Sequence, residues 1–299
     1  MVAPLKKEMM WLIVGGDGQL GRSMAQHLAN SGVAFKAVGR SSLDITNVHQ
    51  VESVLRENQP DVVLNAAAWT NVDLAEEAEE EAGKVNTSGA AFLAAVSKSI
   101  GARFVQISTD YVFSGNSKTP RLESSPTNPD SAYGRTKAEA ERLVQEIYPE
   151  GTFLVRTAWL YGPYGRNFAK TMARMAERDS EIVDVVDDQI GQPTYSMDLA
   201  DQILTMFQSE APAGIYHGTN SGSCTWYDFA RQIFTLAGED PERVQPITSE
   251  KLNRKSRRPD YSVLGHQHWI DVGMEPMRDW QLALEDAFSS IRIAAGMEE

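Results

Sequence analysis

Residues 10–21 read MWLIVGGDGQLG, and this stretch decides the fold that the rest of the chain is expected to adopt. The apolar run at residues 10–14 is typical of a buried first strand. A helix should follow at residues 19–30, because apolar side chains recur there at helical spacing. Strand, glycine turn and helix in this order form the setting of a dinucleotide-binding motif, whose helix N-terminus receives a pyrophosphate. Rather than a plain tight turn, we therefore predict cofactor contacts from Gly15, Gly18, Gln19, Leu20 and Gly21.

Downstream of this motif, strands and helices are expected to alternate. Short apolar runs predict strands at residues 34–38, 60–65, 103–107 and 153–156, with helices at 48–57, 86–99 and 131–148 between them. Such alternation predicts an α/β fold, a Rossmann-type doubly wound parallel sheet with right-handed crossovers. Residues 1–8 read as a loose leader, and the acidic run at 76–81 as a solvated helix start.

The pattern loosens after Trp159, which suggests a second, smaller α/β domain for substrate binding. Helices are expected at residues 168–178, 196–207 and 226–236, and strands at 183–189 and 214–217. The helix at 196–207 and the strand at 214–217 could return to the main sheet. We therefore divide the chain into a cofactor domain, 9–157 plus about 192–219, and a sugar-nucleotide domain, about 158–191 plus 220–299.

Composition limits the class of protein. The chain has 299 residues, of which 42% are hydrophobic and 23% charged, as in an ordinary globular protein. Its formal net charge of −13 argues against nucleic acid or an anionic membrane as a partner. Cys224 is the single cysteine, so no internal disulfide is possible, which suits a reducing cytoplasm. No zinc-ligand spacing and no run of membrane-spanning length is present.

Two further segments refine the cofactor prediction. A dinucleotide fold that prefers NAD usually carries an acid after its second strand, but this chain has Arg40 there. Arginine suits phosphate geometry, so Arg40 favours the 2′-phosphate of NADPH, with NADH possibly accepted too; the alternative is a solvated arginine. Asp44, which Ile45 follows, is either a helix cap or an acceptor for the adenine amino group.

The residues that carry chemistry follow the strand at 103–107. That strand ends in Ser108, Thr109 and Asp110, at the edge of the sheet where ligands sit in open α/β folds. Tyr133 and Lys137 lie four residues apart and share a helix face. A neighbouring ammonium favours the phenolate and lowers the phenol pKa, so the pair reads as a proton donor to a carbonyl. The alternative interpretation is an exposed helical pair.

A basic segment near the end of the chain is the natural place for a diphosphate in an acidic protein. Residues 251–258 hold five cationic side chains, Arg257 and Arg258 among them. A solvated basic turn is the alternative for this segment.

Longer strings of residues resemble a known family. They are AAAWTNVDLAE at 66–76, STDYVFSG at 108–115, RTAWLYG at 156–162, DQIGQPT at 188–194 and RRP at 257–259. With the glycine turn and the Tyr133/Lys137 pair, they are similar to the dTDP-4-dehydrorhamnose reductase family of the extended short-chain dehydrogenases/reductases. The resemblance implies reduction of the C4 ketone of a dTDP-4-keto-6-deoxyhexose by NADPH, in a monomer or a homodimer.

The resemblance also implies roles for individual positions. Thr109 would hydrogen-bond the C4 carbonyl, Tyr133 would protonate it, and Lys137 would hold the nicotinamide ribose and lower the pKa of Tyr133. Further cofactor contacts are expected from Ala66, Ala67, Ala68, Asn86 and Ser108. The substrate set is Trp69, Thr109, Asp110, Tyr111, Trp159, Asn167, Gln189, Arg257 and Arg258.

Related activities remain as alternatives. Sugar-nucleotide dehydratases carry an acid where this chain has Tyr111, so simple reduction fits better. Some reductases of the family use a glutamate in the first helix for a magnesium-bridged dimer; Ser23 stands at that place, so no metal is predicted. The family also resembles the non-catalytic regulatory subunit of methionine adenosyltransferase, and a sugar-nucleotide epimerase is a third possibility.

Overall fold

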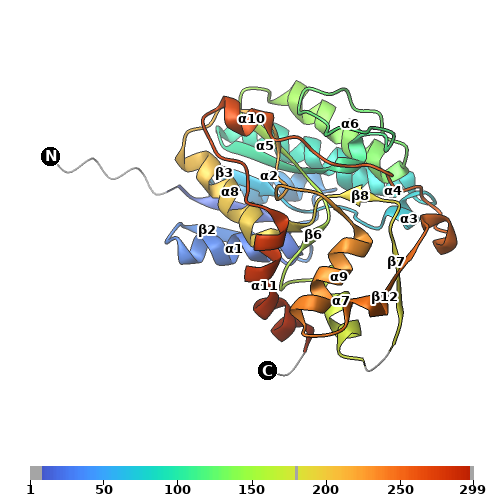
Figure 1. Cartoon of the computed structure of the whole chain (residues 1–299). Helices are drawn as coiled ribbons and strands as arrows, with labels where there is room; N and C mark the ends of the chain where they lie inside the picture. The colour runs from blue at the N-terminus through green and yellow to red at the C-terminus, as the bar shows by residue number, and fades with distance from the viewer. Residues whose placement is uncertain (1–8, 179–180, 297–299) are drawn as a thin grey trace.

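A six-stranded parallel sheet forms the centre of the computed structural model, which describes residues 9–178 and 181–296 (Figure 1). Its strands, in spatial order, are β10 (Gly214–His217), β5 (Thr152–Thr157), β4 (Arg103–Thr109), β3 (Val62–Asn65), β1 (Trp11–Val14) and β2 (Phe35–Val38). All neighbouring strands pair in parallel. The predicted Rossmann-type sheet is confirmed, and the strand predicted at 214–217 does return to it.

Helices cover both faces of this sheet because its strands are apolar on both sides. One face packs against α1 (Gln19–Asn30), α8 (Ser196–Gln208) and α10 (Gln267–Asp271). The opposite face packs against α2 (Val48–Asn58), α5 (Ala90–Ile100) and α6 (Ala132–Ile147). The strand order reverses beside β1, because the chain runs from β1 outward to β2 and then crosses to β3. Ligands of open α/β sheets bind at such a switch point, outside the carboxyl ends of the strands.

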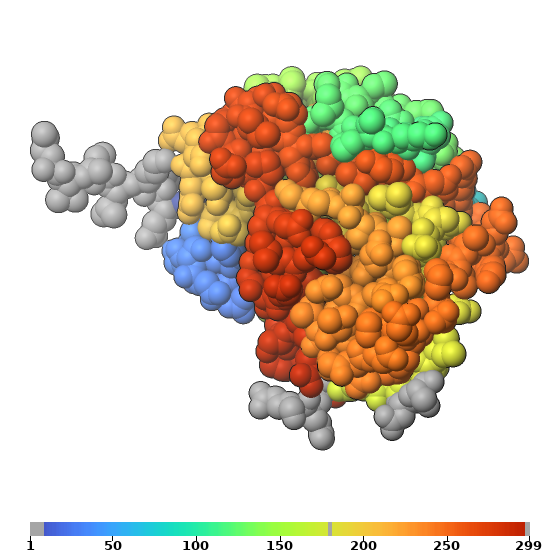
Figure 2. Space-filling view, in the orientation of Figure 1, coloured from blue at the N-terminus to red at the C-terminus, as the bar shows by residue number. Residues whose placement is uncertain are grey.

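A second hydrophobic core lies in the later part of the chain. Its helices are α7 (Phe168–Ala176), α9 (Trp226–Leu236) and α11 (Trp280–Ala295). Three two-stranded pairs accompany them: β6 (Leu160–Tyr161) with β9 (Thr194–Tyr195), β7 (Val183–Val186) with β12 (Val244–Ile247), and β8 (Ile190–Gly191) with β11 (Cys224–Thr225). Figure 2 shows this later part of the chain, yellow to red, covering most of the visible face, with the green segments along its upper edge.

Short helical segments complete the fold. They are α3 (Val72–Ala75), α4 (Glu79–Gly83), the π-helical η1 (Lys84–Gly89), and the 3₁₀ turns η2 (Asp110–Val112), η3 (Pro241–Arg243) and η4 (Ser249–Leu252). Within the described residues, no helix combines the length and the apolar character that a bilayer span needs. The leader expected at residues 1–8 lies outside the described residues.

Several predicted bounds are wrong, for local reasons. The helix predicted at 86–99 is preceded by α4 and begins as η1, a π-helix whose wider turn carries Asn86 inward. The strand predicted at 183–189 ends at Val186, because Asp188 turns back to accept hydrogen bonds from Ser249 N at 3.0 and 2.9 Å. The helix predicted to reach residue 178 ends at Ala176.

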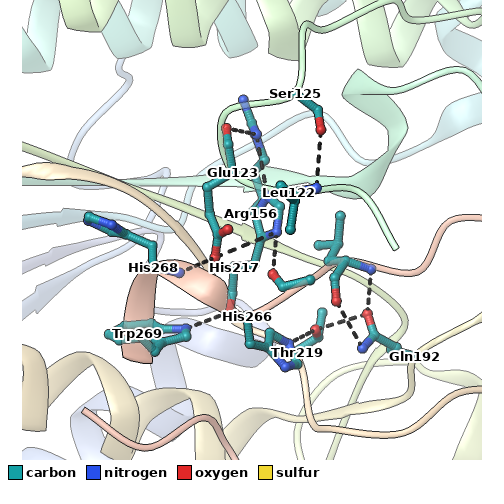
Figure 3. Close-up of polar contacts among 12 residues, drawn as sticks. Leu122, Glu123, Ser125, Arg156, Gln192, His217, Thr219, His266, His268 and Trp269 are labelled. Atoms are coloured by element: carbon teal, nitrogen blue, oxygen red, sulfur yellow. Dashed lines mark hydrogen bonds and ion pairs between the residues drawn. The ribbon is translucent and has the colours of Figure 1, made fainter. Parts of the chain in front are cut away.

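A buried polar cluster joins β5, β10 and the segment before α10 (Figure 3), and an ion pair with Glu141 extends it to α6. Arg156 of β5 is 2% exposed and pairs with Glu141 of α6, Nη2 to Oε2 at 2.7 Å. The same guanidinium donates through Nη1 to the Glu123 carbonyl at 3.2 Å and lies 3.3 Å from His217 Nε2. His217 Nδ1 lies 2.7 Å from the Gly265 carbonyl. One buried cation therefore ties together segments that are far apart in the sequence.

Candidate active site

The glycine turn packs so closely on the neighbouring strand that side chains are excluded from it. Gly15 has a φ of +80°, and a Cβ there would fall 2.6 Å from the backbone N of Ala67. A Cβ at Gly21 would fall 2.3 Å from the Gly15 carbonyl. The turn therefore presents bare backbone at the N-terminus of α1, as a pyrophosphate requires. The residues present fit a dinucleotide.

A cavity of about 260 Å³ opens beside this turn. It is lined by eight of the predicted cofactor residues, Gly15, Gly18, Arg40, Asp44, Ile45, Ala66, Ala67 and Ala68, together with Asp17, Gly39, Leu43 and Val85. Arg40 is exposed at its rim. Asp44 accepts from Thr46 N at 3.0 Å and from Thr46 Oγ1 at 2.8 Å, so it is a local cap that still faces the cavity.

The predicted catalytic residues converge at the carboxyl end of β4. Tyr133 and Lys137 lie in the first turns of α6, whose N-cap is Ser131. Lys137 is 3% exposed, and its Nζ donates to the Ile107 carbonyl at 2.6 Å. Thr109 hydrogen-bonds Tyr133. β4 pairs with β3 and α1 follows β1, so this group shares one sheet edge with the glycine turn.

Burial governs the acidity of this group. It raises the pKa of Tyr133 to about 12, which the hydrogen bond with Thr109 partly offsets. Burial lowers the pKa of Lys137 to about 8, although the carboxylate of Glu141 acts to raise it. The expected lowering of the Tyr133 pKa by Lys137 is therefore not what the structure has, because burial dominates and Thr109 is the only group among the described residues that lowers this pKa. Tyr133 carries its proton throughout the physiological range.

Ser108 and Asn86, both predicted to contact the cofactor, have different surroundings. Ser108 is 3% exposed, and its Oγ has no hydrogen-bond partner within residues 9–178 and 181–296, which leaves it for a ligand. The Asn86 amide, in contrast, accepts from Trp69 N at 2.8 Å and donates to the Trp69 carbonyl and Thr136 Oγ1. Asn86 therefore positions the Trp69 loop against α6.

Tyr111 and Asp110 of the predicted substrate set lie beside the catalytic tyrosine. The rings of Tyr111 and Tyr133 meet edge to face with centroids 5.7 Å apart. Asp110 is buried and accepts a hydrogen bond from Thr109 Oγ1 at 2.9 Å.

Trp159 and Asn167 lie in the later part of the chain, and each has a clear structural task. Trp159 stacks on Trp226 with centroids 3.5 Å apart, and its φ of +44° is rare for a bulky side chain. Asn167 caps α7 through Lys170 N and donates to Gln19 Oε1 at 2.9 Å. The side chain expected to touch sugar therefore also bridges to the glycine turn.

The basic segment borders a cavity of about 730 Å³ that Gln189 also lines. Arg258 forms a two-pronged ion pair with Asp73, at 2.7 and 2.8 Å, and holds the pKa of that carboxyl at about 2. Arg257 is exposed and pairs with Asp260 at 3.1 Å. Arg254, which belongs to the predicted basic segment but is not singled out there, has neither a hydrogen bond nor an ion pair among the described residues. Its pKa is lowered by burial and by Arg258.

Sequence reasoning did not single out Arg254, because five cations within eight residues do not show which of them a carboxylate will neutralise. It missed Ser262, which comes from a distant segment and lowers the pKa of Asp110. Asp17 was overlooked for another reason, since it lies inside the glycine motif as a variable position. A Cβ at Gly39 would fall 1.6 Å from Asp17 Oδ2, so this carboxylate lies directly over the start of the Arg40 loop.

Known proteins share this architecture and these motifs. A family model described as the RmlD substrate binding domain matches residues 9–293. A dTDP-4-dehydrorhamnose reductase of Streptomyces griseus is 46% identical over 290 residues, which cover 96% of this chain and 95% of the relative. The chain belongs to the dTDP-4-dehydrorhamnose reductase family.

Two further members of the dTDP-4-dehydrorhamnose reductase family bear on ligands. A dTDP-4-keto-6-deoxy-D-glucose reductase of Streptomyces niveus is 45% identical, over 93% of this chain and 96% of its own length. The solved dTDP-4-dehydrorhamnose reductase of Bacillus anthracis, in complex with NADP, superposes with a TM-score of 0.91 at 37% identity. That match covers 95% of this chain and 99% of the solved one. The predicted family is thereby confirmed.

Proposed function

We propose that this protein reduces the C4 ketone of a dTDP-4-keto-6-deoxyhexose to an alcohol with NADPH. One observation carries the proposal: Thr109, Tyr133 and Lys137 meet at the end of β4, on the sheet edge that also carries the glycine turn. A proton donor and a hydride donor must approach one carbonyl together, and this edge provides for both.

Each residue has a distinct task in the reaction. NADPH, when bound, supplies the hydride. Gly15, Gly18 and Gly21 would admit its pyrophosphate, Arg40 would meet the 2′-phosphate, and Lys137 and Ser108 would hold the nicotinamide end. Tyr133 donates its proton to the ketone oxygen, and the buried Lys137 ammonium stabilises the phenolate that remains.

The substrate side is assigned to the later part of the chain. The division into residues 9–157 plus about 192–219, and about 158–191 plus 220–299, agrees with the separate core of the later helices. Within the 730 Å³ cavity, Arg254 is best placed to meet the diphosphate, since Asp73 already neutralises Arg258. Arg257 lies at the rim. Trp69, Tyr111, Trp159, Asn167 and Gln189 would surround the nucleotide sugar.

The assembly and location of the enzyme follow as proposals. The enzyme would work as a monomer or a homodimer. Its location would be the cytoplasm, which supplies NADPH and nucleotide sugars.

The decisive experiment mixes the protein with NADPH and either dTDP-4-dehydrorhamnose or dTDP-4-keto-6-deoxy-D-glucose, and follows the absorbance of reduced nicotinamide. We expect NADPH to be consumed in equimolar amount with the preferred ketone. Binding to methionine adenosyltransferase without NADPH consumption would support the regulatory reading instead. Epimerised product without net loss of NADPH would identify an epimerase. The relative rates with the two ketones, and the product stereochemistry by NMR, define the sugar.

A further inference from the structure

A continuous hydrogen-bond chain runs from the catalytic phenol into the protein interior. Tyr133 bonds Thr109, and Thr109 Oγ1 donates to Asp110 Oδ1 at 2.9 Å. Thr109 Oγ1 also accepts from the backbone N of Tyr111 at 3.2 Å, which starts the η2 turn. Thr109 and Asp110 are 6% and 2% exposed, so water has little access to this chain.

The Thr109 hydroxyl has no proton left for a ligand in this arrangement. A hydroxyl offers one proton and two lone pairs. The Thr109 proton points to Asp110, while one lone pair receives the Tyr111 amide. In this state Thr109 cannot donate to a substrate ketone.

Asp110 has the surroundings of a carboxylate that can take up a proton and so change its hydrogen bond with Thr109. Its second oxygen, Oδ2, has no hydrogen-bond partner of normal geometry in the part of the chain that the structure describes. Burial raises the pKa of Asp110 to about 6, against hydrogen bonds from Ser262 and Thr109. The charge of Asp110 raises the pKa of two neighbouring phenols, Tyr111 and Tyr133. The cations of Arg254 and Arg258 act on Tyr111 in the opposite direction. No cation contacts this carboxylate among the described residues.

We propose that Asp110 takes up a proton when the ketone binds, which turns the Thr109 proton toward the ketone. A protonated Asp110 donates to Thr109 Oγ1 instead of accepting from it. Thr109 then accepts from Asp110 and Tyr111 and donates to the ketone. Asp110 is thus a positioning residue and a proton reservoir for the proposed reduction, on which this inference rests.

The proton balance closes over one turnover. Hydride from NADPH forms the C–H bond at C4, the Tyr133 proton forms the O–H bond, and NADP⁺ and a Tyr133 phenolate remain. Thr109 then passes its proton to the phenolate and receives the Asp110 proton in return. This restores the carboxylate and the phenol of the ligand-free arrangement, and the proton taken up on binding is the one the reduction consumes.

Proton uptake on binding tests the proposal without turnover. The ketone dTDP-4-keto-6-deoxyhexose is titrated into the protein saturated with NADP⁺, by calorimetry at pH 7.5 in two buffers of different ionisation enthalpy. We expect wild type to take up close to one proton per ketone bound, and Asp110→Asn to take up none. No uptake in wild type, or equal uptake in Asp110→Asn, would overturn the proposal.

Variants of Thr109 keep the test decisive if Asp110→Asn folds poorly. Thr109→Val preserves shape but cuts the chain, so uptake should vanish although Asp110 remains. Thr109→Ser restores the hydroxyl and should restore uptake. Persistence of uptake in Thr109→Val would show that Asp110 is not its source.

Kinetics separate the reservoir from a merely structural role. In Asp110→Asn the amide can still donate to Thr109, so KM for the ketone should change less than threefold and become independent of pH. Loss of the reservoir should lower kcat tenfold or more. A rise in KM at unchanged kcat would assign Asp110 to the fold or to binding. If wild type consumes no NADPH with any ketone, the proposed function fails; if it consumes NADPH without uptake, only this inference fails.

Discussion

At the scale of single residues, Tyr133 is the proton donor on which turnover depends. Its pKa of about 12 means that the phenol stays protonated while a carbonyl approaches. Tyr133→Phe removes only the hydroxyl, so we expect kcat to fall about 10²–10⁴-fold, the usual contribution of a positioned acid. The NADPH dissociation constant, measured by fluorescence titration, should change less than twofold.

A matched control lies at the C-cap of the same helix. Tyr148 follows the last turn of α6, packs in the core, and is far along the helix from Thr109. Tyr148→Phe should leave kcat within about a factor of two of wild type. Comparable losses in the two variants would mean that Tyr133 acts through packing and not through its proton.

Cofactor choice is also decided by individual side chains. Arg40 and Asp17 line the same 260 Å³ cavity with opposite charge. Removing the cation in Arg40→Ala should weaken NADPH about tenfold and leave NADH nearly unchanged, because only NADPH carries the 2′-phosphate. Removing the anion in Asp17→Asn should tighten NADPH relative to NADH. Equal shifts for both cofactors in either variant would contradict a 2′-phosphate contact.

At the scale of elements, the basic segment after η4 offers two neighbouring arginines in different states. Arg254 has no ion-pair partner among the described residues, whereas Arg257 is bound to Asp260. Arg254→Gln should raise KM for the dTDP-sugar about tenfold or more, since a charge–phosphate contact is lost. Arg257→Gln is the matched control and should raise KM less than twofold. Equal rises in KM in the two variants would mean that Arg257 also contacts the diphosphate, as the sequence alone suggests.

The individual elements also show how much of the structure can be predicted from the sequence. The bounds of α1 and α9 follow from local rules, a glycine turn before Gln19 and a capping box at Thr225 and Asp228, so both helices are predictable to the residue. The catalytic trio is predictable because its spacing is local and one sheet edge collects it. The pairing of Arg258 with Asp73 joins residues 185 apart, and no local pattern encodes it. Asn86 and Asn167 carry family motifs, yet their amides are occupied by backbone and by Gln19, which only the folded chain shows.

At the scale of the whole molecule, the buried cluster of Figure 3 links the sheet to the later part of the chain, and two of its histidines are held neutral. Burial, assisted by the Arg156 cation, lowers the pKa of His217 to about 3. Burial lowers the pKa of His266 to about 4. The neutral Nε2 of His217 can accept from Arg156, and its Nδ1–H can donate to Gly265, an arrangement that protonation destroys.

Acid should therefore weaken the whole fold through this cluster. A histidine whose pKa is lower in the folded state binds more protons when unfolded, so the free energy of unfolding falls as the pH drops from about 6.5 toward 3. His217 contributes at most about 1.4 kcal/mol per pH unit within that window. In urea denaturation between pH 7 and pH 4.5, His217→Asn should be less stable than wild type at pH 7 but lose stability less steeply on acidification. His49→Gln, at an exposed histidine of α2, should keep the wild-type slope. Parallel slopes for His217→Asn and wild type would mean that the acid sensitivity has its source elsewhere. Glu123 is not that source: burial raises its pKa, so its contribution to the free energy of unfolding increases as the pH falls.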